Sequence, residues 1–187
     1  MNIVVKRFLS YLIDMFIIFV FIFLFSLFFD NKYEAKINDL NQLLLEEKIE
    51  YKEYKNLYYN YYHSLDKENI YINIYTIILI LLFFVLIPLN TGQTIGQKVF
   101  KIKIISDNKL TKEDLIGRSI IINGLGFLLF MLIILYLVND KIYFILINFF
   151  AFLQIIVVII NFFMVLYSYK NCGIADKFTN TRIEEIK

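Results

Sequence analysis

The chain has few of the residues that cross-link a soluble domain or turn its backbone. Its 187 residues include one cysteine, one proline, six glycines, one histidine and no tryptophan. A single cysteine excludes an internal disulfide, and one Cys with one His excludes a Cys/His metal set. The net charge of +2 is too small to indicate nucleic-acid binding. Only 19% of the residues are charged, against about 25% in soluble domains, which excludes an ordinary globular domain.

Hydrophobic residues are abundant instead, at 59% of the chain, and they gather into four blocks. Each block has about the 20 residues that an α-helix needs to cross a hydrocarbon core of about 30 Å. The sequence therefore predicts one all-α domain, residues 1–187, that sits in a lipid bilayer as a polytopic membrane protein. The four expected transmembrane helices are 8–29, 70–89 (ended by Pro88 and Asn90), 119–138 and 142–167.

Polar segments separate these spans. Residues 30–69 hold six lysines, nine carboxylates and the histidine, so they cannot lie in lipid. An apolar and Tyr stripe at helical spacing predicts that they form a long, water-exposed amphipathic helical loop. Alternating Lys and aliphatic residues over 98–104 predict a short strand-like loop on the membrane surface. Thr111 is the expected N-cap of the next helix, and 168–187 is a polar tail.

Lysine and arginine are unequally divided between the two sides of this topology. Two lie at the N-terminus, six in 90–118 and four in the tail, compared with six in 30–69 and one in the turn before the last span. By the positive-inside rule, both termini and the strand-like loop are expected in the cytoplasm, and 30–69 outside. The expected location is the cell (cytoplasmic) membrane, which the chain crosses several times.

Asp14 is the most informative residue of the first span, because a carboxylate within an apolar helix is costly and marks a candidate site. Helical periodicity places Arg7, Ser10, Tyr11 and Asp14 on one face. Two interpretations stay open. Asp14 belongs to a polar site, or it hydrogen-bonds a neighbouring helix while Arg7 reaches the lipid headgroups.

Polar and small residues also interrupt the last two spans. Gln154 and Asn161 are seven residues apart, so they lie on one face of a helix. Such amides either join helices by hydrogen bonds or line a path for a cargo, and both interpretations stay open. Asn123, Gly124 and Gly126 predict a close helix crossing in the third span.

Residues 92–98 (GQTIGQK) resemble a phosphate-binding loop only superficially. A P-loop has four residues between its glycines and a Lys directly after the second, whereas three intervene here and Gln97 precedes Lys98. The chain also has no Gly-x-Ser-x-Gly elbow and no HExxH motif. We therefore expect no enzymatic activity, no cofactor and no metal.

Three separated segments form one pattern. Arg7 and Asp14 have six residues between them; residues 92–104 read Gly-x-Thr-x-Gly-x-Lys before an Ile-Lys-Ile; and Asp176 precedes a Thr-x-Ile at 181–183. In order, spacing and position relative to the spans, this pattern resembles the RDD family of small bacterial membrane proteins. The resemblance assigns the family's loop motif to Gly92, Thr94, Gly96 and Lys98.

The resemblance implies a transporter, with cation/proton exchange suggested for some members. Two positions depart from the family pattern. Ala175 stands where many members have His, so a His–Asp pair for handling protons is absent from this site. Gln97 stands where a basic residue is frequent.

Two hypotheses follow. In the first, which the family favours, Arg7, Ser10, Asp14 and Asp176 form a polar transport site for a monovalent cation or proton, in a homodimer. In the second, these residues only hold the fold together, and residues 30–69 bind a partner as part of a scaffold or regulatory protein.

Overall fold

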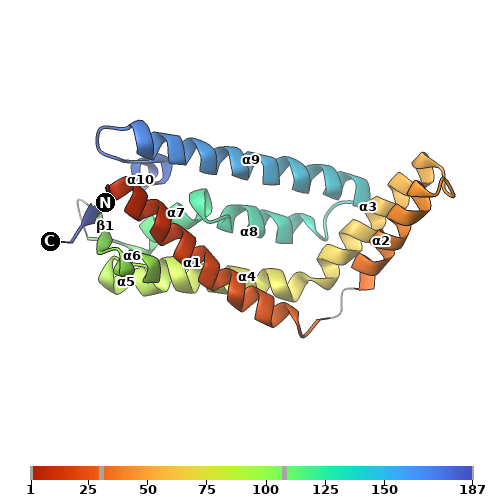
Figure 1. The fold of residues 1–187 in the computed structure, drawn as a ribbon, viewed down its shortest axis with the longest axis horizontal. Helices are drawn as coiled ribbons and strands as arrows, with labels where there is room; N and C mark the ends of the chain where they lie inside the picture. The colour runs from red at the N-terminus through yellow and green to blue at the C-terminus, as the bar shows by residue number, and fades with distance from the viewer. Residues whose placement is uncertain (1, 30–31, 107–108, 187) are drawn as a thin grey trace.

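The structure is a computed structural model that describes residues 2–29, 32–106 and 109–186. Its long helices lie lengthwise in an elongated bundle, with both chain ends at the same end (Figure 1). The expectation of a mostly helical membrane protein is confirmed, because the described part contains three helices long and apolar enough to cross a membrane, Ile3–Ser26, Ile70–Thr91 and Asp140–Tyr167. In chain order the elements are α1 (Ile3–Ser26), α2 (Lys32–Leu45), α3 (Tyr51–Glu68), α4 (Ile70–Leu81), a π-helical segment η1 (Leu82–Leu86), α5 (Ile87–Thr91), α6 (Ile95–Val99), β1 (Ile102–Ser106), α7 (Lys112–Ile122), α8 (Leu125–Ile134), α9 (Asp140–Tyr167), α10 (Ile174–Phe178) and β2 (Thr181–Glu185).

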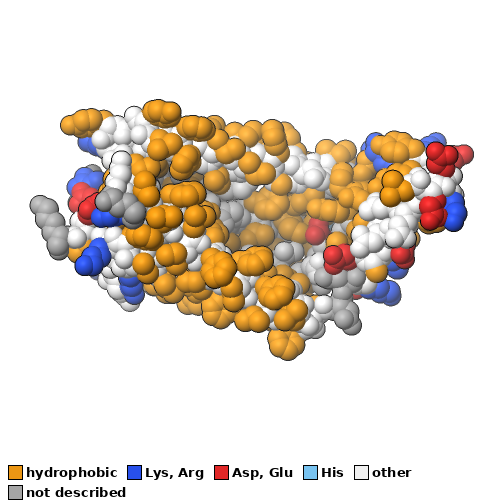
Figure 2. Space-filling model, in the orientation of Figure 1, with side chains coloured by type: hydrophobic (Ala, Val, Ile, Leu, Met, Phe, Trp, Pro, Cys, Tyr) orange, Lys and Arg blue, Asp and Glu red, His pale blue; other side chains and the backbone are white. Residues whose placement is uncertain are grey.

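The outside of the bundle has the polarity of a protein embedded in lipid. On the face shown in Figure 2, hydrophobic side chains cover the middle, whereas Lys, Arg, Asp and Glu gather toward the two ends. Phe16, Phe19 and Phe152 are among the large apolar side chains left exposed. An apolar patch of this size would associate in water, but lipid tails solvate it.

The third expected span, 119–138, is not one straight helix. α7 and α8 meet at an angle of 75°, and Gly124, at the break, has a left-handed φ of +74°. Glycine adopts this conformation without the clash that a Cβ would make. Asn123 and Gly124 thus mark a bend rather than the predicted close crossing. The described chain therefore has three helices long and apolar enough to be spans, and a fourth span only if the bent pair is counted as one.

The second span continues past Pro88, where the sequence predicts its end. Proline lacks an N–H group and its ring clashes with the carbonyl four residues earlier. The five residues of η1 immediately before α5 form a wider π-helical turn that relieves this conflict. The helix then ends at Thr91, because Gly92 follows in the left-handed conformation, with φ +70°.

The polar segment between the first two spans is a helical hairpin, not one amphipathic helix. α2 and α3 pack against each other and project from the end of the bundle opposite the chain termini (Figure 1). The chain turns around Glu47, whose φ is +54°. The turn falls where the predicted apolar stripe has its widest gap, between Leu44 and Tyr51.

The predicted strand over 98–104 is confirmed only in its second half. Lys98 and Val99 belong to α6, whereas β1 begins at Ile102. β1 pairs antiparallel with β2, with Ile104 opposite Ile183. Because β2 comes from the tail, the tail and the loop after the second span form one small layer at the end of the bundle where the termini lie. Thr111 caps α7 as predicted.

Candidate functional site

Asp14 is held by the first turn of α6. The carboxylate is 2% exposed on the inner face of α1. Its Oδ2 accepts a hydrogen bond from Thr94 Oγ1 (2.6 Å), and its Oδ1 accepts one from the backbone N–H of Gly96 (2.7 Å). Thr94 also caps α6 in a reciprocal pair with Gln97. The first and second sequence motifs therefore meet at this carboxylate.

The close packing of α6 against α1 depends on a glycine. A Cβ at Gly96 would lie 2.0 Å from the backbone oxygen of Ser10. Ser10 is buried, and its Oγ donates to the carbonyl of Arg7 (2.8 Å) within α1. Ser10 thus supplies the backbone surface on which α6 rests. Lys98, the last residue of the loop motif, is exposed.

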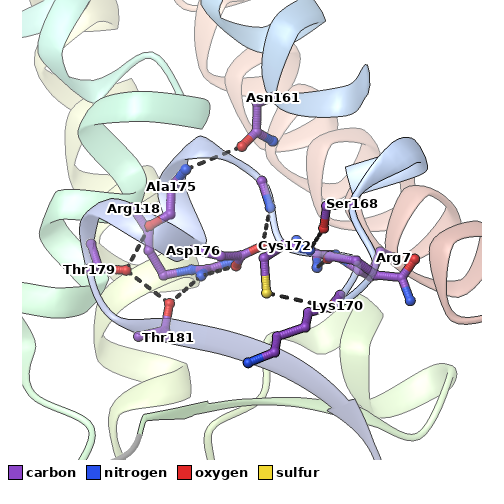
Figure 3. A network of polar contacts seen from close by, with 12 residues as sticks. Arg7, Arg118, Asn161, Ser168, Lys170, Cys172, Ala175, Asp176, Thr179 and Thr181 are labelled. Atoms are coloured by element: carbon purple, nitrogen blue, oxygen red, sulfur yellow. Dashed lines mark hydrogen bonds and ion pairs between the residues drawn. The ribbon is translucent and has the colours of Figure 1, made fainter. Parts of the chain in front are cut away.

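Asp176 lies between two arginines that come from α1 and α7 (Figure 3). Arg7 Nη2 donates to Oδ2 (2.6 Å), and Arg118 Nη1 donates to Oδ1 (2.5 Å). The backbone N–H of Gly173 also donates to Oδ2 (2.8 Å). Burial would raise the pKa of Asp176, which is 1% exposed, but the Arg118 and Arg7 guanidinium groups outweigh burial and lower it.

Arg118 is the residue of this cluster that the sequence does not predict. It is buried, and its Nη1 also donates to Thr181 Oγ1 (2.5 Å), which lies 2.8 Å from the hydroxyl of Thr179. An arginine at the entrance of a span is normally expected to reach the headgroups. Its only sequence signal is its place in an otherwise apolar helical turn next to Ser119.

The structure divides the expected polar site in two. Asp14 contacts α6, whereas Arg7 contacts Asp176, and no ion pair joins Arg7 to Asp14 in the described part of the chain. Asp14 and Arg7 still border one cavity of about 390 Å³, to which α1, α7 and α9 contribute most of the lining, whereas Asp176 does not line it. The hydrocarbon side of this cavity includes Phe8 and Phe162, whose ring centroids are 5.8 Å apart.

Gln154 and Asn161 both join helices through hydrogen bonds to backbone groups. Gln154 Nε2 donates to the carbonyl of Ile121 (3.0 Å), next to the bend between α7 and α8. Asn161 Oδ1 accepts from the N–H of Ala175 (3.2 Å) at the start of α10. These contacts match the helix-joining interpretation. Asn161 also borders the cavity, so the same side chain both joins α9 to α10 and lines the cavity.

A second polar cluster joins α3 to the other end of the bundle. His63 is 2% exposed, with Nδ1 2.6 Å from Asp140 Oδ1 and Nε2 2.7 Å from the carbonyl oxygen of Leu135. Because both neighbours are acceptors, both contacts are hydrogen bonds only when both ring nitrogens carry a proton. Tyr143 stacks on the ring, and its hydroxyl donates to Asp66 (2.8 Å), a carboxyl whose pKa burial raises.

We expect His63→Leu to release α3 from the bundle. The change removes the contacts of the imidazole with Asp140 and with the Leu135 carbonyl, and a buried polar group left without its partner costs about 1–3 kcal/mol. A local loss of about 3 kcal/mol corresponds to roughly a hundredfold faster amide exchange over 51–68. Hydrogen exchange of wild type and variant measures this. Tyr51→Ala, on the exposed face of the same helix, is the control, and unchanged protection in His63→Leu would show that the cluster does not hold the hairpin.

The fold and the site define a helical membrane protein whose first span, central loop and tail meet through two buried carboxylates. The model of the RDD family matches residues 3–180. The chain therefore belongs to the RDD family, as its three motifs predict. No curated protein and no solved structure matches the chain.

Proposed function

We propose that the protein is a membrane transporter that exchanges a proton for a monovalent cation at Asp14. The supporting observation is the state of this carboxylate. It is buried in a span, it borders the cavity, and among the described residues its contacts are two hydrogen bonds and no ion pair. Asp14 can therefore gain or lose a proton without breaking a salt bridge, unlike Asp176.

The proton and the cation would compete for the same group. Ionised Asp14 offers the negative charge that a cation needs in a membrane interior, and protonated Asp14 does not. Thr94 and Gly96 favour the ionised form by donating to it. Both belong to α6, so a displacement of this short helix would remove two donors together and favour uptake of a proton.

The unequal charge of the two ends of the bundle supports an orientation of the protein in the membrane. The chain termini, α6 and the paired strands lie at one end of the bundle (Figure 1), and the segments at that end hold most of the Lys and Arg residues. We place this end in the bacterial cytoplasm and the α2–α3 hairpin outside the cell membrane. We also propose a homodimer, because a single chain of 187 residues is small for a complete path.

Flux into proteoliposomes tests the proposal. The purified chain is reconstituted with a pH-sensitive dye inside, and Na⁺, K⁺, Li⁺ or benzyltrimethylammonium is added outside. We expect cation-dependent proton movement in wild type and its loss in Asp14→Asn, which keeps the side-chain shape. Asp39→Asn makes the same change at an exposed carboxyl of α2 and should leave flux unchanged. Absence of flux with every cation, under either direction of the gradient, would overturn the proposal.

A second candidate function is partner binding through the α2–α3 hairpin. The hairpin favours it because it projects beyond the apolar middle of the bundle and carries charged side chains (Figure 2). Asp14 would then be a structural clamp between α1 and α6. In that case Asp14→Asn lowers the yield of folded protein before it changes any flux, which the monodispersity of the purified variant measures.

A further inference from the structure

Three polar side chains attach α3 to the start of α9. Asn60, His63 and Asp66 are spaced by three residues, so they lie along one side of α3. Asn60 Nδ2 donates to Asp140 Oδ2 (3.0 Å), and His63 Nδ1 lies 2.6 Å from Oδ1 of the same carboxyl group. Asp66 accepts a hydrogen bond from the hydroxyl of Tyr143. Because His63 also reaches the end of α8, its ring joins three helices.

Both contacts of the His63 ring require a proton from the ring. The partner of Nδ1 is a carboxyl oxygen, and the partner of Nε2 is the carbonyl oxygen of Leu135, 2.7 Å away. Leu135 directly follows α8, where a carbonyl has no partner within the helix. A neutral imidazole carries one N–H, so either tautomer turns a lone pair toward an acceptor oxygen. The imidazolium ion has an N–H on each nitrogen and satisfies both oxygens.

Burial makes this mismatch of the neutral ring costly. His63 is 2% exposed, so little water can reach the ring to replace the missing donor. Tyr143 covers one face of the ring, with centroids 4.3 Å apart and planes inclined by 17°. A buried acceptor without a donor has lost its hydrogen bonds to water and gained none in the protein. Deprotonation of the ring therefore weakens the attachment of α3 directly.

The charged groups around the ring can balance an imidazolium ion. Asp140 is 41% exposed and lies in the first turn of α9, where solvent and the helix dipole both support a carboxylate. Burial raises the pKa of Asp66, while Tyr143 and the charge of His63 act to lower it. Lys67 acts on Asp140 from α3. The titratable groups on the elements packed around the ring are Tyr59, Tyr62, Asp66 and Lys67 of α3, Tyr136 after α8, and Asp140 and Tyr143 of α9.

We infer that His63 is a pH-sensitive clamp: as an imidazolium ion it bridges α3 to α8 and α9, and loss of its proton loosens the α2–α3 hairpin from the bundle. The attachment is therefore strongest in acid and weakens as rising pH deprotonates the ring, because the folded contacts require the charged form. Imidazole is the side chain whose charge ordinarily changes between pH 5 and 8. The clamp lies at the end of the bundle opposite α6 (Figure 1) and does not depend on the proposed transport.

Two measurements on the full-length chain in lipid nanodiscs test the inference. The chain has one histidine, so NMR of the ring nitrogens in protein labelled with ¹⁵N-histidine reports on His63 alone. Hydrogen exchange is followed from pH 5 to 9, with each rate divided by that of an unstructured peptide at the same pH. We expect protection over 51–68 to fall at least tenfold as the pH rises, with the same midpoint as the loss of the imidazolium signal. Protection over 150–165, in the middle of α9, should stay constant.

Two variants assign the pH dependence to the ring. His63→Gln keeps a neutral hydrogen-bonding side chain of similar size and should make protection over 51–68 independent of pH. Asp66→Asn removes the neighbouring carboxyl group of α3 and should keep the pH-dependent fall in protection.

The midpoint comparison needs no variant, so it stands even if a substitution prevents folding. Constant protection over 51–68 in wild type from pH 5 to 9 would overturn the inference. So would midpoints of the two measurements that differ by more than about one pH unit, an equal fall in His63→Gln, or loss of the fall in Asp66→Asn.

Discussion

Asp176→Asn is expected to lower the free energy of unfolding by about 3–5 kcal/mol, because it leaves two buried guanidinium groups without their carboxylate. Arg7 and Arg118 both contact Asp176, and the neutral amide cannot balance either charge. The tail, which carries Asp176 in α10, should separate from the bundle first. A lower melting temperature in detergent and loss of amide protection over 174–185 are the expected observations.

The pH dependence of stability, compared between wild type and Asp176→Asn, measures the contribution of the ionised carboxylate alone. Arg118 and Arg7 lower the pKa of Asp176 in the folded state, so its ionised form stabilises the fold above the ordinary Asp value of about 4. This contribution is lost as the pH falls through the folded pKa. The difference between wild type and Asp176→Asn should therefore be constant from pH 7 to 5 and shrink below about pH 4.

A surface pair supplies the control for this substitution. Arg182 Nε lies 2.7 Å from Glu184 Oε1 on β2, with both side chains about half exposed. Exposed pairs contribute about 0–1 kcal/mol, so Glu184→Gln should change the melting temperature little. A loss as small in Asp176→Asn as in Glu184→Gln would contradict the role given to the buried cluster.

Gly96→Ala is expected to abolish proton flux and to destabilise the fold by about 3–5 kcal/mol. The added Cβ would lie 2.0 Å from the backbone oxygen of Ser10, and neither backbone can yield without moving a helix. α6 must then move away from α1, so Asp14 loses its hydrogen bonds to Thr94 and Gly96. Flux in liposomes and melting in detergent measure the two effects.

Gly124→Ala is the matched control, because it adds the same methyl group where no atom lies within 4 Å. Its left-handed φ of +74° makes alanine unfavourable by about 1–2 kcal/mol. The variant should therefore fold with a modestly lower melting temperature and retain flux. A Gly96→Ala protein that folds and transports like wild type would show that the contact between α1 and α6 is not required.

Features that depend on local periodicity could be predicted from the sequence. Long apolar runs identify helices that cross lipid, because no other element satisfies its own backbone there. The N-cap at Thr111 depends on neighbouring residues alone and is confirmed. The three motifs predicted the family, which the match to residues 3–180 confirms.

Features that depend on contacts between residues far apart in the chain could not be predicted from the sequence. β1 needs β2, some 80 positions away, and nothing in either strand specifies that partner. From the sequence alone, Arg118 is expected to contact lipid headgroups, because its partner Asp176 lies in α10, far along the chain. The sequence could not distinguish a bend at Gly124 from a close helix crossing, because glycine permits both a close approach of helices and a left-handed turn.

The proposed exchange of a proton for a cation at Asp14 is tested most directly by infrared difference spectroscopy of the carboxyl group. Wild type in lipid, at a pH where the group is protonated, should show a carboxylic acid C=O band that is absent in Asp14→Asn. Adding at constant pH whichever of Na⁺, K⁺, Li⁺ or benzyltrimethylammonium drives proton movement in liposomes should replace this band with carboxylate absorption and release a proton to the buffer. A band that persists at saturating cation, or one that is equally present in Asp14→Asn, would contradict the account.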